Sequence, residues 1–163
     1  IITEIRDGVL HIYKEANIRE AEMKRVYVTM KDISSLKTTS AGDIIGETPV
    51  KTDNLELSAS SAGDIKLEIY AKDIEATISS SGDVTLSGEA DVLNANLSSA
   101  GDLNSIGLEV READFSASSA GDADINVSER LRARSSSAGD INYRGNPKYV
   151  DAHSSSAGGV HRK

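Results

Sequence analysis

The stretch SASSAGDIKLEI, residues 58–69, decides the fold, because its core Ser-Ser-Ala-Gly-Asp returns with small changes six more times along the chain. The glycines of successive copies are separated by 21, 19, 19, 20, 18 and 19 residues. A fixed period near 19 is typical of a solenoid, in which each repeat forms one coil and stacks on its neighbours. A serine stands two positions before every glycine, and the pairs are Ser40 and Gly42, Ser61 and Gly63, Ser80 and Gly82, Ser99 and Gly101, Ser119 and Gly121, Ser137 and Gly139, and Ser156 and Gly158.

Around the motif, apolar and polar residues alternate with period two. In the second copy Leu55 and Leu57 share one parity with Ile65 and Leu67, which predicts a strand with one buried face. The parity continues through the motif, so we expect the Ser and Gly of Ser-x-Gly to point inward, and the Ala and Asp to point outward. Small inward residues would let the wall of the coil bend or approach the opposite wall, while the serine hydroxyls bond to one another or to backbone.

These patterns predict an all-β chain folded as a single-stranded parallel β-solenoid of about seven coils, each of about 19 residues and two main strands. Right-handed coiling is expected for parallel crossovers. We expect one domain over 1–163, with irregular strands or a cap over 1–35 and repeat coils over 36–163. Within the first part, DGVLHIYKE (7–15) and KRVYVTMKD (24–32) predict strands, and the charged stretch 16–23 predicts a loop.

The composition narrows the class of protein. The 163 residues include no Cys and carry a formal net charge of −8, which argues against nucleic acid and anionic membrane as main partners. No apolar run is long enough for a transmembrane helix, and no signal peptide opens the chain. Since the chain begins with Ile1 and not Met, we expect a mature product or a fragment.

The repeats SSAGDI, SSSGDV and SSAGDL, together with the closing SSSAGDINYRGNPKYVDAHSSSAGGVHRK, resemble the head GIN domain family. Its members are described as putative autotransporter adhesins and are common in secreted and lipid-anchored proteins of Bacteroidetes. DGVLHI resembles the strand before the repeats in that family, and the resemblance spans roughly residues 5 to 162. The strands that normally open the domain are missing, which agrees with a truncated start. The resemblance implies an envelope or extracellular location and brings no catalytic residues with it.

One aspartate follows the glycine in six of the seven copies and would form an outward ladder with one carboxylate per coil. Such a row could hold Ca²⁺ or another cation, because hard cations prefer carboxylate oxygens. The structural alternative, which we favour, is that each carboxylate accepts hydrogen bonds at a bend of the coil. We therefore expect no firm metal site and no cofactor, with calcium as the open alternative. The candidate residues are Asp43, Asp64, Asp83, Asp102, Asp122 and Asp140.

A short basic run is the second candidate. Arg130, Arg132 and Arg134 share the outward parity and could bind an acidic glycan or a carboxylate, although such a run is more often a solvated face. The three histidines, at 11, 153 and 161, show no metal-ligand spacing. No serine is distinguished as a nucleophile, because its copies are equivalent.

The sequence is compatible with two functions, one of a binding module and one of an enzyme. The first, which we favour, is a non-catalytic module of the cell envelope or outer surface that presents a rigid face to a surface glycan or protein. The second is a polysaccharide lyase or hydrolase on a β-helix scaffold, which rests on fold analogy alone. Few aromatic residues and no long insertions are available to build a sugar cleft. The ends of the solenoid expose strand edges, so self-association through them is also expected.

Overall fold

The N-terminal part of the chain forms a small unit of its own. The computed structural model describes residues 1–15 and 24–163, and its contacts divide the chain into two compact units, 1–31 and 32–163. In the first unit, β1 (Ile2–Arg6) pairs antiparallel with β2 (Val9–Tyr13). Asp7 and Gly8 join them with φ angles of 49° and 79°, as a tight hairpin turn requires.

The strand expected within 7–15 is confirmed as β2, whereas β1 was not predicted. The prediction of a strand over 24–32 is wrong, because the structure forms no strand in this segment. Val26 and Val28, whose alternation suggested a buried face, are 40% and 44% exposed. The predicted loop over 16–23 lies outside the described residues.

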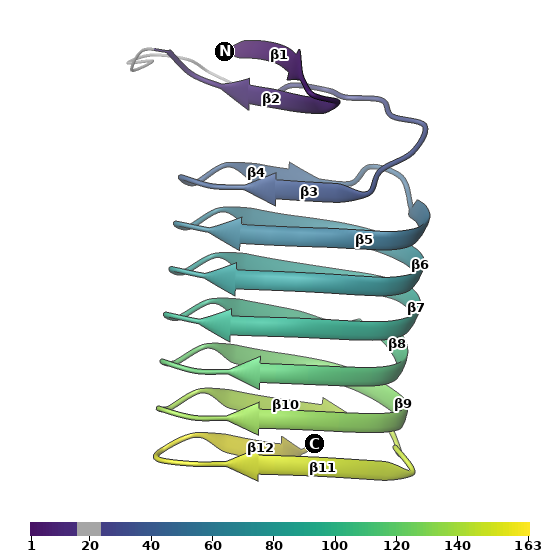
Figure 1. Cartoon of the computed structure of the whole chain (residues 1–163), viewed down its shortest axis with the longest axis vertical. Coiled ribbons are helices and arrows are strands. Elements are labelled where there is room, and N and C mark those ends of the chain that lie inside the picture. Colours follow the sequence, from purple (N-terminus) through teal and green to yellow (C-terminus); the bar gives the residue numbers. More distant parts are fainter. Residues whose placement is uncertain (16–23) are drawn as a thin grey trace. The chain divides into compact units, whose positions relative to one another are not determined.

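The second unit is a parallel β-solenoid, as predicted (Figure 1). All of its strand pairs are parallel, and the register places each repeat directly beside the next, so that Asp64 pairs with Asp83 and Asp83 with Asp102. In Figure 1 the chain turns clockwise as it recedes from the N-terminal end, so the coil is right-handed. The strands are β3 (Ser35–Thr38), β4 (Asp43–Ile45), β5 (Val50–Ser60), β6 (Asp64–Ser79), β7 (Asp83–Ser98), β8 (Asp102–Ala117), β9 (Asp122–Ser135), β10 (Asp140–Arg144), β11 (Tyr149–Ser154) and β12 (Gly159–Arg162).

The central coils differ from the expected two strands per coil. β6, β7 and β8 are each one strand of 16 residues. Each strand bends midway and so contributes to both faces of the solenoid (Figure 1). Within the described residues there is no helix, and thus no helix that is long and apolar enough to cross a membrane.

The core is a set of stacked columns, one residue per coil. Leu55, Ile74 and Leu93 pair in register and are 2%, 0% and 0% exposed. In the described part of the chain, the buried polar side chains each donate a hydrogen bond to a backbone carbonyl: Thr38 to Gly42, Ser105 to Asp124 and Ser135 to Gly139. Because inward and outward residues pair in the same register, the outward side chains of successive coils also form rows along the solenoid.

The repeated motif forms a tight turn, and this corrects one expectation. Ser61 and Ala62 have φ angles of 57° and 60°, and the Gly63 N–H donates to the Ser60 carbonyl at 3.2 Å. Two residues in the left-handed conformation, closed by this bond, make a type I′ turn. Serine and alanine are unusual in such a turn, because the left-handed conformation costs a residue with a Cβ about 1–2 kcal/mol.

The glycines point inward as expected, and Gly63 is buried, but the serines do not. All seven motif serines are exposed, so they form no inward hydroxyl ladder. They lie at the first corner of the turn, where the left-handed backbone directs the side chain out. The turns stack through backbone hydrogen bonds, such as Ala62 N–H to the Ser80 carbonyl at 3.1 Å, which compensates for the strained backbone.

Candidate functional site

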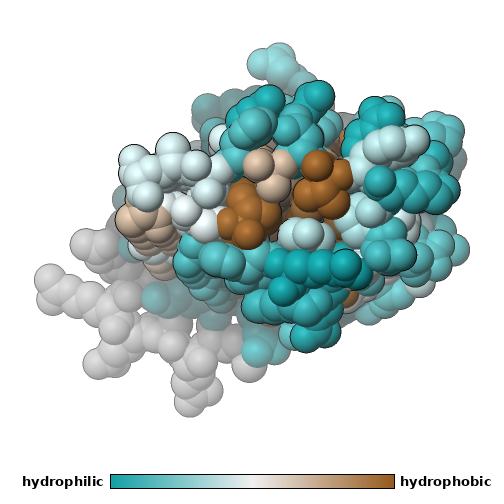
Figure 2. Space-filling view, turned by 90° about the horizontal axis from the view of Figure 1, so that it is seen from below, coloured by the Kyte–Doolittle hydropathy of each residue, from teal (hydrophilic) through white to brown (hydrophobic). Residues whose placement is uncertain are grey.

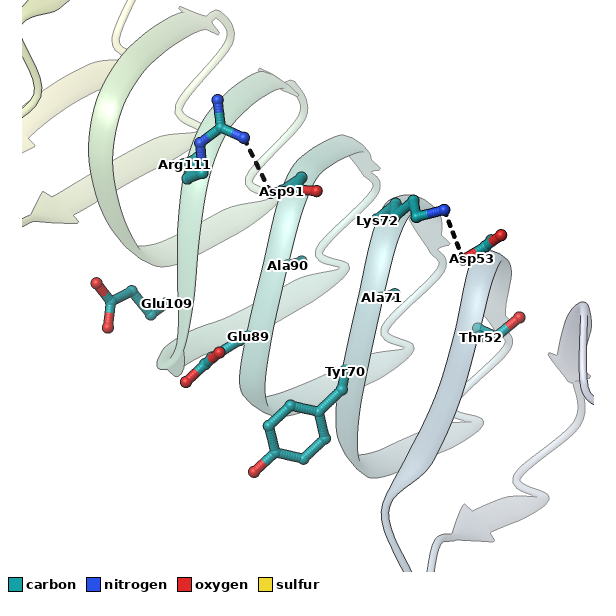
Figure 3. Close-up of a pocket in the computed structure, with 10 residues that line it drawn as sticks. All are labelled: Thr52, Asp53, Tyr70, Ala71, Lys72, Glu89, Ala90, Asp91, Glu109 and Arg111. Carbon is teal, nitrogen blue, oxygen red and sulfur yellow. Dashed lines mark hydrogen bonds and ion pairs between the residues drawn. The ribbon is translucent and has the colours of Figure 1, made fainter.

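A shallow groove of about 500 Å³ lies over the bend of strands β5–β8 (Figure 3). Its floor is a row of small side chains, Thr52, Ala71 and Ala90, which pair in register from coil to coil. Because each strand bends at this point, the side chains on either side of the floor diverge. They form two walls that run along the axis of the solenoid.

One wall is a ladder of alternating charge. Asp53, Lys72, Asp91 and Arg111 occupy the same place in successive coils, and Figure 3 shows them on one side of the groove. Lys72 Nζ lies 3.0 Å from Asp53 Oδ1, and Arg111 Nη1 lies 3.0 Å from Asp91 Oδ1. Arg111 also reaches Glu129 of the following coil at 3.5 Å. These contacts raise the pKa of Lys72 and of Arg111, chiefly through hydrogen bonds to Asp53 and Asp91, so the charges of this wall are largely neutralised from within.

The opposite wall is aromatic and acidic. Tyr70, Glu89 and Glu109 pair in register and point away from the ladder of alternating charge (Figure 3). Tyr70 is 39% exposed, and its hydroxyl donates to Glu68 Oε1 at 3.1 Å, which raises the pKa of Tyr70. Lys51 Nζ lies 5.8 Å from the centroid of the ring.

The two glutamates of this wall have no ion-pair partner within the described part of the chain, so their carboxylates remain available as acceptors. An aromatic ring beside free carboxylate acceptors, above a floor of small residues, can bind a ligand that offers both apolar C–H surface and hydroxyl or ammonium donors.

The aspartate ladder lies in register as predicted. Six aspartates from Asp43 to Asp140 pair coil by coil, and Gly159 takes the seventh place. Asp102 Oδ1 accepts the Asp122 N–H at 3.3 Å, and Asp122 Oδ1 accepts the Asp140 N–H at 3.0 Å. These bonds support the structural reading of the ladder.

No group of three or more acidic, histidine or cysteine side chains suited to a metal ion occurs over residues 1–15 and 24–163. Binding of a cation by the ladder therefore stays a prediction.

The three arginines lie outward on β9, as predicted, but two of them are engaged. Arg132 contacts Asp114 at 3.3 Å and Asp151 at 3.5 Å. Arg130 lies 3.8 Å from Glu112 and 5.9 Å from the centroid of the Tyr149 ring. Arg134 pairs in register with Ser116 and His153 and is exposed. The acidic neighbours compete with an acidic ligand, so the run resembles the solvated face that we also considered.

The histidines lie in separate elements. His11 belongs to β2, whereas His153 and His161 lie on β11 and β12 and approach Asp151 and Asp140 at 3.0 and 3.8 Å. Among the described residues, none of the three histidines belongs to a group of three or more side chains that could hold a metal ion.

The groove was missed in the sequence, although a signal for it exists. Asp53, Lys72, Asp91, Arg111 and Glu129 follow one another at intervals of 19, 19, 20 and 18 residues, with alternating sign. Writing the sequence in rows of one repeat would place these residues in one column and reveal the ladder. Tyr70 gives no such signal, because it occurs in a single coil.

Comparison with known proteins places the chain in a family. Residues 1–147 match the family described as putative auto-transporter adhesin, head GIN domain. The chain belongs to the head GIN domain family. This family description points to an adhesin-like domain with a cell-surface or secreted location. No curated protein matches the chain.

Two solved structures share the fold of this head GIN domain. A putative adhesin from Bacteroides fragilis matches with a TM-score of 0.87 at 20% identity, over 99% of this chain and 75% of that one. A putative lipid binding protein from Parabacteroides distasonis matches with a TM-score of 0.63 at 20% identity, over 80% of this chain and 61% of that one. At this identity the likeness shows the fold alone.

Proposed function

We propose that this head GIN domain is a non-catalytic adhesion module of the cell envelope or extracellular space, which binds a surface glycan along the bend groove. The observation that carries the proposal is the wall formed by Tyr70, Glu89 and Glu109. Its two carboxylates lack ion-pair partners within the described part of the chain, in contrast to the opposite wall. Sugar rings offer C–H faces to an aromatic side chain and hydroxyl donors to carboxylates, and both are present here.

The scaffold supports binding by an extended ligand. The groove crosses four strands that are locked together by continuous parallel pairing, so its walls hold a fixed spacing of about 4.8 Å per coil. A preformed wall loses little conformational entropy on binding, which favours affinity. The open groove can also be entered along its length by a polymer, as adhesion to a surface glycan requires.

The geometry favours binding over glycoside hydrolysis. Glycosidases place two carboxyl groups on opposite sides of the bond that breaks. Glu89 and Glu109 are neighbours on one wall and point the same way (Figure 3). The acids of the other wall, Asp53 and Asp91, are held by Lys72 and Arg111. The groove therefore supplies acceptors for hydroxyl groups on one side only.

A glycan array followed by titration of the best ligand tests the proposal. Tyr70→Ala should weaken the dissociation constant at least about tenfold, which corresponds to about 1.4 kcal/mol. Glu89→Gln and Glu109→Gln should each weaken it as well. Thr77→Ala, on an exposed outward position of β6 away from the groove, is the matched control and should leave affinity unchanged.

Three outcomes would refute the proposal. Affinity that is unchanged in Tyr70→Ala would place the ligand elsewhere on the surface. Binding to a surface protein without binding to any glycan would exclude the ligand class. Release of shortened glycan that Glu89→Gln abolishes would identify an enzyme.

A further inference from the structure

The end of the solenoid formed by β11 and β12 leaves open the interior that the other coils cover. Val150 pairs in register with Leu131 and is 46% exposed, whereas Leu131 is 0% exposed. Ala152, the next inward residue, is exposed, although its neighbour Ala133 is fully buried. Figure 2 looks at this end and shows brown hydrophobic side chains at its centre, bordered by teal polar ones.

The backbone of β11 has one paired and one unpaired edge. The Ser155 N–H donates to the Ser135 carbonyl of the preceding coil at 3.0 Å. In a parallel pair, alternate residues direct their backbone groups to alternate sides, so the odd-numbered residues of β11 bond to β9. The even-numbered residues, Val150, Ala152 and Ser154, direct their N–H and C=O groups to the open edge. An edge of this kind accepts another strand.

We propose that a second copy of this chain occupies this edge, with β11 of the two copies pairing antiparallel about a two-fold axis at Ala152. A two-fold interface requires a surface that is complementary to itself. The polar side chains of β11 meet this requirement in one register. Asp151 contacts Arg132 and His153 of its own chain, so a second imidazole opposite it would extend this cluster. With Ala152 opposite Ala152, Asp151 of each copy lies opposite His153 of the other, and Val150 lies opposite Ser154.

The neighbouring registers lose this match between carboxylate and imidazole. Only shifts of two residues keep the even-numbered backbone groups paired. A shift in one direction places Asp151 opposite Asp151, and a shift in the other places His153 opposite His153. Side chains directly opposite each other in antiparallel strands lie about 4.5–5.5 Å apart, so the two Asp151 carboxylates would repel each other in the first of these registers. In the second, neither Asp151 faces an imidazole. The register at Ala152 thus follows from the order of Asp151 and His153 in the strand.

The second copy would also cover the apolar end. Val150 and Ala152 of each copy point toward the interior column that ends at Leu131 and Ala133. Pairing of the two β11 strands would extend the sheet from one solenoid into the other, and would bury these side chains between two closed coils. The result is a continuous solenoid with twice the number of coils.

A single introduced cysteine tests the register. Since the chain has no Cys, Ala152→Cys can form a disulfide only with another copy. Hydrogen-bonded residues opposite each other in an antiparallel pair have Cα atoms about 5.5 Å apart, within the range that a disulfide spans. Under mild oxidation we expect Ala152→Cys to form a covalent dimer readily. Thr77→Cys, an exposed position on β6, is the matched control and should form far less.

Sedimentation of the unmodified chain tests the association itself. We expect a dimer that dissociates on dilution. His153→Asp should weaken it at least about tenfold because Asp then lies opposite Asp, and the double exchange Asp151→His with His153→Asp should restore it. A monomer at every concentration would overturn the proposal. Crosslinking of Ala152→Cys no greater than that of Thr77→Cys would overturn the register.

Discussion

Gly82 lies against the backbone of Ala59 in the preceding coil. A Cβ at position 82 would come within 2.8 Å of the Ala59 carbonyl carbon and oxygen, closer than real Cβ atoms approach. Gly101 stands in the same relation to Ile78, again at 2.8 Å. At these positions glycine is therefore required by the close stacking of the turns, and the interval between successive motif glycines gives the number of residues in one coil.

Replacing this glycine should destabilise the fold. In Gly82→Ala the new methyl group must push two backbones apart, and overpacking of this kind costs about 1–3 kcal/mol. The free energy of unfolding in urea measures the loss. Gly107→Ala is the matched control, because its Cβ would approach no atom more closely than the Ser87 Cβ, at 3.3 Å. Equal losses in the two variants would contradict the role of coil stacking.

The aspartate ladder should make stability depend on pH through Asp83. Burial, followed by the carboxylates of Asp102 and Asp64, raises the pKa of Asp83 above its ordinary value. A raised pKa means that the folded state binds the proton more tightly than the unfolded state. The contribution of Asp83 to stability is thus full below the unfolded pKa of about 3.9, and is lost as the pH rises through the folded pKa.

Asp83→Asn should therefore raise the melting temperature at neutral pH, because it removes a carboxylate that its neighbours repel. The gain should shrink in acid, where Asp83 of the unmodified chain is protonated. Asp114→Asn is the control, since Asp114 pairs with Arg132 at 3.3 Å, and its loss should lower stability at neutral pH. A lower melting temperature for Asp83→Asn at neutral pH would show that its carboxylate stabilises the fold.

Calcium should leave the melting temperature unchanged. Asp102 and Asp122 already accept backbone N–H groups of the next coil, so their oxygens are partly used by the fold itself. A ligand present at 100 times its dissociation constant would add about 2.7 kcal/mol to stability. Melting in millimolar Ca²⁺, compared with a chelator, measures this directly. A rise of several degrees that Asp83→Asn and Asp102→Asn reduce would instead assign a cation site to the ladder.

The fold could be predicted because the signal is repeated. Leu55, Ile74 and Leu93 recur at intervals of 19 residues, so each coil repeats the evidence of the one before it. The orientation of the motif serines was wrong, because Ser61 and Ala62 adopt left-handed backbone that a period-two pattern does not represent. Ser-Ala is also not the usual sequence of a type I′ turn, for which Asn-Gly is typical.

Other features depend on partners that alternation does not specify. Val26 and Val28 alternate as strand residues do, yet the structure leaves their segment unpaired and their side chains exposed. The groove arises where the strands bend, and there the alternation shifts by one residue. In β6 the buried residues are odd-numbered up to Ile69 and even-numbered from Ile74 onward, a shift that the sequence analysis did not use. Tyr70 becomes a candidate only once the structure places it beside Glu89 and Glu109.

The repetition of the same turn and the same parallel pairing from coil to coil also bears on how such chains evolve. Each coil of the solenoid contacts chiefly its two neighbours, through parallel pairing and the same kind of turn. Duplication of a gene segment that encodes one coil would insert a coil that can make the same kind of contacts with both of its new neighbours, and would lengthen the solenoid by about 4.8 Å. The length of the solenoid can then change by one coil at a time during evolution, while the binding surface of the existing coils stays the same.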